Sequence, residues 1–299
     1  QTGGAGASDQ IDINYRIEGQ DMAGSGWNYI SSNSKITLSF WVKSSVAQNF
    51  YGYIRSVSGT VRSHPYETGS LTADTWTKIT KTFSGDSNIT INNDNSVEFN
   101  FYLVPFYGTG STASGVSLTA WNTYDATALM PDNTSTWYTT NDATLEITGV
   151  QLEVGSQATA FEHRSFGDEL RLCQRYYHKS LQYGTTPQQG IPLSSNTTVD
   201  LDGFNGWIMF STTACRSPIF DYPVEMRAIP TVTVYSSGRV TSPDDNKLAL
   251  YNGGAWLNTT QSDPRQNTRR IGFLGSVSSG LTQFSAYLFG GGYDCDAEL

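Results

Sequence analysis

Charged residues, cysteine and long apolar runs are all scarce in this chain of 299 residues. Only 15% of its residues are charged, and 27 acidic against 18 basic side chains give a net charge of -9 at pH 7. A surface that binds nucleic acid needs clustered Lys and Arg to neutralise phosphates, so we expect no nucleic-acid partner. No apolar run approaches the ~20 residues of a membrane helix, and no basic-then-apolar leader opens the sequence. We therefore expect no membrane insertion.

The three cysteines, Cys173, Cys215 and Cys295, are too few and too scattered for a disulfide framework, and none belongs to a C-x-x-C pair. Free Cys behaves as a small apolar residue, so burial is the expectation for each of them. A bridge between Cys215 and Cys295 is the less favoured alternative.

Glycine, serine, threonine and asparagine are abundant, and aromatic residues reach 13%. Glycine and asparagine supply turns with positive φ, while aromatic and β-branched side chains fit pleated surfaces. The composition therefore predicts an all-β protein. The length is about twice that of a common domain, which favours two domains.

Clean alternation of apolar and polar residues marks several strands. Residues 35–43 place Ile36, Leu38, Phe40 and Val42 on one face and Thr37, Ser39 and Trp41 on the other. Val97, Phe99, Phe101 and Leu103 repeat this pattern, with Glu98, Asn100 and Tyr102 pointing away. The apolar phase of residues 145–154 changes at Gly149, which predicts a β-bulge there.

One segment, 165–180, has helical periodicity. Ser165 is the expected N-cap, Asp168 and Glu169 fall in the first turn, and His178 and Lys179 fall in the last, as the helix dipole favours. A helix this short is marginal alone and must pack on something. Its apolar stripe either faces symmetry mates in an oligomer or packs within the chain; the stripe consists of Phe166, Leu170, Cys173 and Tyr177.

Beyond residue 183 the chain returns to short predicted strands separated by Pro, Gly, Asp and Asn, which fits a second, smaller β-sandwich. The predicted strands are 206–210, 230–235, 247–251, 270–274 and 283–289. The basic residues Arg265, Arg269 and Arg270 lie in a polar stretch that is most simply a solvated turn.

Catalytic signals are weak, and the sequence does not predict an enzyme. The only histidines, His64, His163 and His178, have no nucleophile or metal motif around them. A glycosidase needs two carboxylates across a cleft; Asp125 and Asp132 are one of many pairs that an acidic chain offers.

Sugar binding is the chemistry that the residue types support best, because shallow carbohydrate sites combine exposed aromatic rings with amide, carboxylate and guanidinium groups. The C-terminal candidates are Tyr251, Asn252 and Trp256, and Asp244, Asp245 and Asn246. Trp121 with Tyr124, and Trp137 with Tyr138, are similar pairs in the first half. Packing of these aromatics in cores or subunit interfaces is the alternative.

The segment TGVQLEVGSQATAFEHRSFGDELRLCQRYY (148–177) resembles a junction in virion and tail-fibre proteins of tailed bacteriophages, especially those of marine and cyanobacterial hosts. Residues 17–45 are similar to the opening strands of the same family domain. The resemblance implies an N-terminal jelly-roll β-sandwich like a carbohydrate-binding module (17–163), a helical connector (164–182) and a C-terminal β-sandwich (183–299). Residues 1–16 would be a flexible or stalk-derived segment.

The same resemblance implies a virion component, assembled in the host cytoplasm, that attaches the particle to a host-surface glycan or protein. Trimerisation and contacts with other virion proteins are also implied. An architectural capsid fibre, decoration or tail-assembly subunit is one alternative, and a glycan-degrading tailspike is another. Jelly rolls often carry a structural calcium near their first and last strands, for which Asp12, Glu18 and Glu153 are candidate ligands, although surface carboxylates are the simpler interpretation. No other cofactor is expected.

Overall fold

The computed structural model describes residues 6–181, 184–190, 207–236, 247–251, 256–277, 281–282 and 285–298. The chain forms two compact units, Gln1–His163 and Arg164–Leu299, and each has its own apolar core. Both are built almost entirely from antiparallel strands, so the predicted all-β sandwich class is confirmed. No helix in the described part of the chain is long and apolar enough to cross a membrane.

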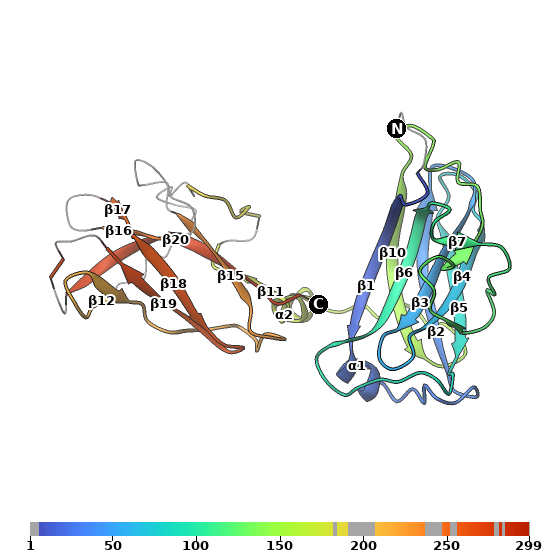
Figure 1. Ribbon diagram of the computed structural model, residues 1–299, viewed down its shortest axis with the longest axis horizontal. Coiled ribbons are helices and arrows are strands. Elements are labelled where there is room, and N and C mark those ends of the chain that lie inside the picture. Colours follow the sequence, from blue (N-terminus) through green and yellow to red (C-terminus); the bar gives the residue numbers. More distant parts are fainter. Residues whose placement is uncertain are drawn as a thin grey trace. The chain divides into compact units, whose positions relative to one another are not determined.

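The first unit is a sandwich of two antiparallel sheets (Figure 1), with strand orders β1-β6-β3-β4-β8 and β10-β2-β5, plus a small β7-β9 pair. Its elements are β1 (Gln10–Glu18), α1 (Gly19–Gly24), β2 (Lys35–Ser44), β3 (Asn49–Ser56), β4 (Arg62–Ser70), β5 (Thr77–Ser84), β6 (Val97–Tyr107), β7 (Thr112–Ala113), β8 (Asn122–Thr123), β9 (Met130–Pro131) and β10 (Leu145–Val154).

The core between the two sheets follows the predicted alternation. The four apolar residues of β2 are at most 2% exposed, and their partners across the core include Phe99, Phe101 and Leu103 of β6. Phe40 packs against the rings of Tyr66 and Phe101 at centroid distances of 6.4 and 5.8 Å. Burial of these side chains is the main force that holds the sheets together.

The opposite faces of these strands are also covered, which alternation alone does not predict. Glu98, Asn100 and Tyr102 point away from the core as expected, yet all three are buried. Tyr102 belongs to a second apolar cluster that also contains Tyr53, Val104, Tyr107, Leu129 and Met130. On β2, Thr37 is buried because its Oγ1 donates a hydrogen bond to the carbonyl of Gly155 at 2.8 Å. Loop segments therefore shield surfaces that the sequence marks as solvent-facing.

The predicted bulge at Gly149 is confirmed. The register between β10 and β2 shifts between Thr148 and Gln151, and Gly149 has a φ of 60°. Positive φ is cheap only for glycine, so this residue fits the bulge without strain.

Strand β1 begins at Gln10 and pairs with β6 from there to Glu18. Most of the segment 1–16, which was expected to be flexible or stalk-derived, is therefore part of the sandwich where it is described. Backbone pairing with β6 is the physical reason, and the alternation of Ile11, Ile13 and Tyr15 with polar residues is the local signal of this strand.

The second unit contains one ten-stranded antiparallel sheet, in which the long strand β20 pairs with β11, β12, β15 and β16. Its elements are α2 (Phe166–Gln174), β11 (Tyr177–Lys179), β12 (Trp207–Met209), β13 (Ala214–Arg216), β14 (Phe220–Asp221), β15 (Thr231–Ser236), β16 (Ala249–Tyr251), β17 (Trp256–Asn258), β18 (Gln261–Gln266), β19 (Arg270–Ser276) and β20 (Ala286–Asp296).

Helix α2 begins as predicted and ends early. The Ser165 Oγ accepts a hydrogen bond from the Asp168 backbone N–H at 3.2 Å, as an N-cap does. The helix ends at Gln174, so its predicted extension to Ser180 is wrong: Tyr177 lies in β11, opposite Asp296 of β20. Pairing with β20 outweighs the helical spacing, and aromatic residues favour strands.

Cys173 is exposed, which corrects the expectation that all three cysteines are buried, whereas Cys215 and Cys295 are fully buried. All three are free thiols. The helix that carries Cys173 has no buried residue, and this is why the apolar stripe does not bury the thiol. Burial raises the pKa of the Cys215 thiol to about 12, and burial likewise raises the pKa of Cys295 to about 12.

We therefore expect a thiol reagent at pH 8 to modify one cysteine per folded chain. Cys173 is accessible, whereas the two buried groups are both shielded and protonated. Counting thiols with a chromogenic disulfide reagent before and after denaturation measures this, and the count should rise from one to three. Cys173→Ala should leave no reactive thiol in the folded chain; a second fast thiol in that variant would contradict the burial.

His64 lies in β4 and is buried between aromatic rings, not in the loop that its Pro65 neighbour suggests. Its ring contacts Phe83 and Trp121 at centroid distances of 4.9 and 5.5 Å, and its Nδ1 is 2.9 Å from the Pro65 carbonyl. Burial lowers the pKa of His64 because an apolar site disfavours the charged ring.

This lowered pKa predicts acid destabilisation of the first unit. An unfolded histidine titrates near pH ~6.5, so below that pH the unfolded chain binds more protons than the folded one. The contribution to stability is present above pH ~6.5 and declines as the pH falls towards and through the folded pKa of His64. Thermal melts between pH 7.5 and 5 measure the decline. His64→Gln should flatten it, while His163→Gln, at an exposed position, should retain the wild-type slope.

Candidate functional site

The predicted C-terminal sugar-binding residues are only partly within the described structure. Asn252 and the trio Asp244, Asp245 and Asn246 lie outside it. Tyr251 is half-buried at the end of β16, and its backbone is directly opposite that of Trp256 in β17. Register thus brings these two residues together, and their role as ligand contacts stays a prediction.

The aromatic pairs proposed for the first unit mostly pack inward. Trp121 is buried, and its Nε1 donates to the Ser84 carbonyl at 2.7 Å. Tyr138 is buried against the ring of Phe106 at 4.0 Å between centroids. The ring of Tyr124 lies under the Arg55 guanidinium. Trp121 and Tyr138 are therefore core residues and offer no open platform for a sugar.

An exposed aromatic surface of the first unit lies instead on the outer face of β2. Trp41 is 41% exposed, and its ring edge is 3.4 Å from the point where a Cβ on Gly149 would stand. Trp76, just before β5, is equally exposed, with the Lys43 Nζ 5.3 Å from its ring centroid. This surface presents rings beside polar groups, a composition found at binding faces.

The candidate calcium ligands are not gathered into one cluster. The Asp12 carboxylate accepts from the Tyr107 hydroxyl at 2.7 Å, Glu18 accepts from the Gln20 amide at 2.7 Å, and Glu153 accepts from the Thr159 backbone at 3.1 Å. The described residues contain no group of three or more acidic, His or Cys side chains arranged for a metal. Glu18 is nevertheless fully buried.

The carboxylates considered for hydrolysis serve local turns. Asp125 accepts from the backbone and hydroxyl of Thr127 at 2.9 and 2.7 Å, and these bonds lower its pKa. Asp132 accepts from the Thr112 hydroxyl at 2.8 Å. The lowered pKa of Asp125 is the opposite of the raised pKa that a general acid needs in glycoside hydrolysis.

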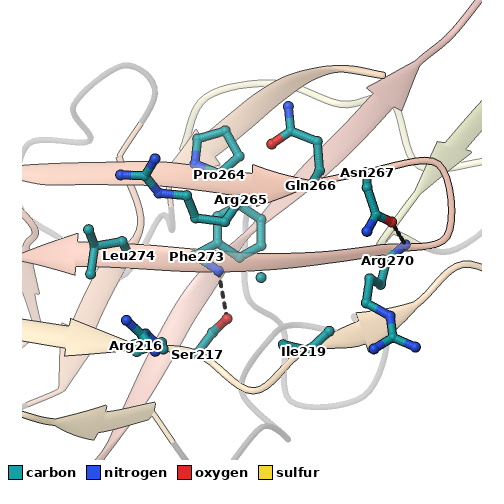
Figure 2. Close-up of a pocket in the computed structure, with 11 residues that line it drawn as sticks. Arg216, Ser217, Ile219, Pro264, Arg265, Gln266, Asn267, Arg270, Phe273 and Leu274 are labelled. Atoms are coloured by element: carbon teal, nitrogen blue, oxygen red, sulfur yellow. Dashed lines mark hydrogen bonds between the residues drawn. The ribbon is translucent and has the colours of Figure 1, made fainter. Parts of the chain in front are cut away.

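A groove of about 680 Å³ opens on the second unit, over the β18–β19 hairpin and the segment from β13 to β14 (Figure 2). We call it the arginine groove. It is lined by Arg216, Ser217, Ile219, Pro264, Arg265, Gln266, Asn267, Arg270, Gly272, Phe273 and Leu274.

A break between two strands shapes one wall of the groove. Strands β13 and β14 both pair with β19, and Ser217, Pro218 and Ile219 connect them. Pro218 has no N–H and cannot continue the ladder. Ser217 holds the connection in place: its Oγ accepts from the Phe273 backbone N–H at 2.7 Å and donates to the Pro218 carbonyl at 2.6 Å.

The strand register places the three arginines on one face. Ile271 and Phe273 of β19 are at most 1% exposed and face the core, so the alternate residues Arg270, Gly272 and Leu274 face outward. Arg265 of β18 is directly opposite Gly272, and Arg216 of β13 is directly opposite Leu274. Opposed residues in an antiparallel pair share a face. Arginines from three strands therefore line the groove that contains Gly272.

Gly272 forms the floor of the groove. A Cβ added there would come within 3.4 Å of the Ser217 Oγ and the Pro218 carbonyl and 3.7 Å of Ile219. The absent side chain leaves space that a larger residue would fill. Ile219, 64% exposed, adds an apolar edge.

The arginines keep exposed donors despite nearby carboxylates. Arg270 pairs with Asp221 at 3.2 Å and Arg265 with Asp263 at 3.8 Å, and these two guanidinium side chains are 52% and 67% exposed. The Arg216 guanidinium lies over the Phe210 ring at 5.8 Å, and none of the ion pairs found in the described part of the chain includes it. Exposed ion pairs contribute little, so a ligand can replace these carboxylates at small cost.

Sequence reasoning missed this groove. Arg269 does lie in the hairpin turn as expected, but Arg265 and Arg270 are strand residues on a common face, and Arg216 was not singled out. One sequence signal could have indicated the hairpin. A polar stretch and the turn residues Asn-Thr-Arg (267–269) come directly before the apolar strand that begins at Arg270. The polar composition and Pro264 obscured β18 in the sequence. Among the described strands β18 pairs with β19 alone, and an edge strand tolerates proline.

Comparison with known proteins found no family model that matches the chain and no curated protein that is significantly similar to it.

Proposed function

We propose that this chain is a virion protein of a tailed bacteriophage that attaches the particle to a glycan on the host surface. The observation that carries the binding role is the arginine groove, an open, ligand-sized hollow with exposed cationic donors on a sheet. Hydrogen bonds between strands hold side chains of a sheet in fixed positions, so a sheet can present a ligand-binding site precisely. The virion setting comes from the resemblance of residues 148–177 and 17–45 to tail-fibre proteins.

The proposal includes a trimer in which helix α2 contributes to the contact between copies. Phe166 is 77% exposed and Leu172 is 47% exposed, and no residue of α2 is buried. Leu170 is half-buried and Tyr177 belongs to β11, so Phe166, Leu172 and Cys173 are the exposed apolar residues of the helix. Three copies of one groove would convert a weak site into firm attachment.

We expect Phe166→Asp to shift the mass in solution from about three times 32.7 kDa towards a single chain. A charge at an apolar contact between copies is costly to bury. Sedimentation equilibrium measures the mass, and Ile30→Asp, at an exposed apolar position in the first unit, is the matched control. A wild-type chain that sediments as a monomer would remove α2 as a trimer contact.

Immunogold electron microscopy of intact virions, with antibody against this chain, tests the attachment role. Label on the distal tail appendages is the expected result. Label over the head would overturn the attachment function in favour of an architectural capsid fibre or decoration protein.

A further inference from the structure

We infer that the arginine groove binds an extended, carboxylated polysaccharide, such as a chain of uronic acids. The inference rests on the proposed attachment function and specifies the ligand of that function. Its basis is the strand positions and the ion pairing of the three arginines labelled in Figure 2, together with the shape of the groove floor at Gly272.

The arginines are staggered along β19, with Arg265 and Arg216 on strands that flank it on opposite sides. Arg270 is on the strand itself, Arg265 is level with residue 272 and Arg216 is level with residue 274. Two residues of an antiparallel strand span roughly 6.8 Å, so the three levels at residues 270, 272 and 274 extend over about 14 Å. A single small anion needs one such level. Cations at three successive levels instead match an extended chain that carries repeated negative charges.

Arginine is suited to carboxylates in particular. Its planar guanidinium presents a fork of donors that matches the two oxygens of a carboxylate. Single carboxylate contacts already reach two of the arginines, Asp221 at 3.2 Å from Arg270 and Asp263 at 3.8 Å from Arg265. Arg216 has no carboxylate among its described contacts. A carboxylate of the ligand would therefore displace no protein carboxylate there.

Charge complementarity favours a polyanion in spite of the protein's own charge. The chain carries a net charge of -9, so an anionic ligand is repelled by most of the surface and held only where cations are concentrated. This contrast supplies specificity for the groove. A neutral glycan would accept hydrogen bonds from the guanidinium groups but would gain no charge complementarity from them.

The shape of the groove favours a sugar chain over nucleic acid. Single-stranded nucleic acid is bound by rows of aromatic rings on which bases stack. Phe210 lies under Arg216, and Phe273 faces the core, so neither offers a free ring face. The floor at Gly272 and the apolar edge at Ile219 instead leave a shallow channel for a pyranose chain.

Calorimetric titration of the full chain with oligogalacturonate, compared with a neutral glucan of equal length, tests the ligand class. We expect oligogalacturonate to bind, the affinity to fall as salt is added, and the glucan to show no binding. Arg216→Gln and Arg265→Gln should each weaken binding about tenfold, the effect of one lost charge-assisted bond. Arg269→Gln, which removes the same charge at the hairpin turn, should stay within about twofold.

Gly272→Val provides a variant without any change of charge. Valine is well suited to a strand and would fill the floor of the groove, so we expect it to abolish binding while the thermal transition of the unit is retained. Equal binding of the glucan, tighter binding of single-stranded DNA of matched length, or full binding by both Arg216→Gln and Arg265→Gln would overturn the inference.

Failure of this inference and failure of the attachment function are distinguishable. If the wild-type chain and the Arg216→Gln, Arg265→Gln double variant adhere equally to host cells, the groove is not the receptor site, although attachment stands. If the wild-type chain does not adhere and the immunogold label lies over the head, the attachment function itself is wrong.

Discussion

Replacing Gly52 with alanine is expected to reduce the free energy of unfolding of the first unit by about 3–5 kcal/mol. Gly52 lies in the middle of β3, between β4 and β6. An added Cβ would stand 2.2 Å from the Tyr102 carbonyl oxygen and 2.4 Å from the Tyr66 ring. Both neighbours are fixed, because the buried Tyr66 hydroxyl crosses β3 to donate to that carbonyl at 2.8 Å.

The clash leaves two unfavourable outcomes: either the strands separate, or Tyr66 withdraws and the carbonyl loses its partner. Differential scanning calorimetry measures the loss. Gly24→Ala is the matched control, because no atom lies within 4 Å of its Cβ position and a change of at most about 0.5 kcal/mol is expected. A Gly52→Ala variant as stable as the wild type would show that Tyr66 does not occupy the space over β3.

Replacing Phe273 with alanine is expected to cost the second unit about 3–5 kcal/mol. The Phe273 side chain is 1% exposed and packs against the Tyr293 ring at 5.3 Å between centroids. Its removal leaves a cavity beneath β19, next to the floor of the arginine groove. For a unit of this size the loss corresponds to a fall in Tm of roughly 10 °C.

The same calorimetric scan tests whether the units unfold separately. Because each has its own core, Phe273→Ala should lower one transition and leave the transition that Gly52→Ala lowers unchanged. Ile219→Ala, at an exposed position near the groove, should alter neither by more than about 0.5 kcal/mol. A single transition that moves equally in both variants would contradict independent unfolding.

Local patterns predicted the elements that depend on neighbours in sequence. Alternation identified β2, β6 and their core faces, a change of phase located the bulge at Gly149, and Ser165 marked the start of α2. These features depend on periodicity, backbone freedom and capping, all of which a short window of sequence contains.

Errors arose where a distant segment decides the outcome. Helical spacing extended α2 to Ser180, but β20 draws Tyr177 into a strand. Polar residues on the second faces of β2 and β6 looked solvent-facing, but loops cover them. The apolar pattern around Cys173 predicted burial, but no surface of the described chain covers it.

By itself, the sequence determined the all-β class, the division into two cores, and the scarcity of charged residues, cysteine and long apolar runs. Only the tertiary structure decided which side chains meet at a site. Arg216 and Arg265 are far apart in the chain, and each looks like an ordinary surface residue. They share one groove because both β13 and β18 pair with β19, and strand pairing between distant segments is set by the packing of the whole unit rather than by local sequence.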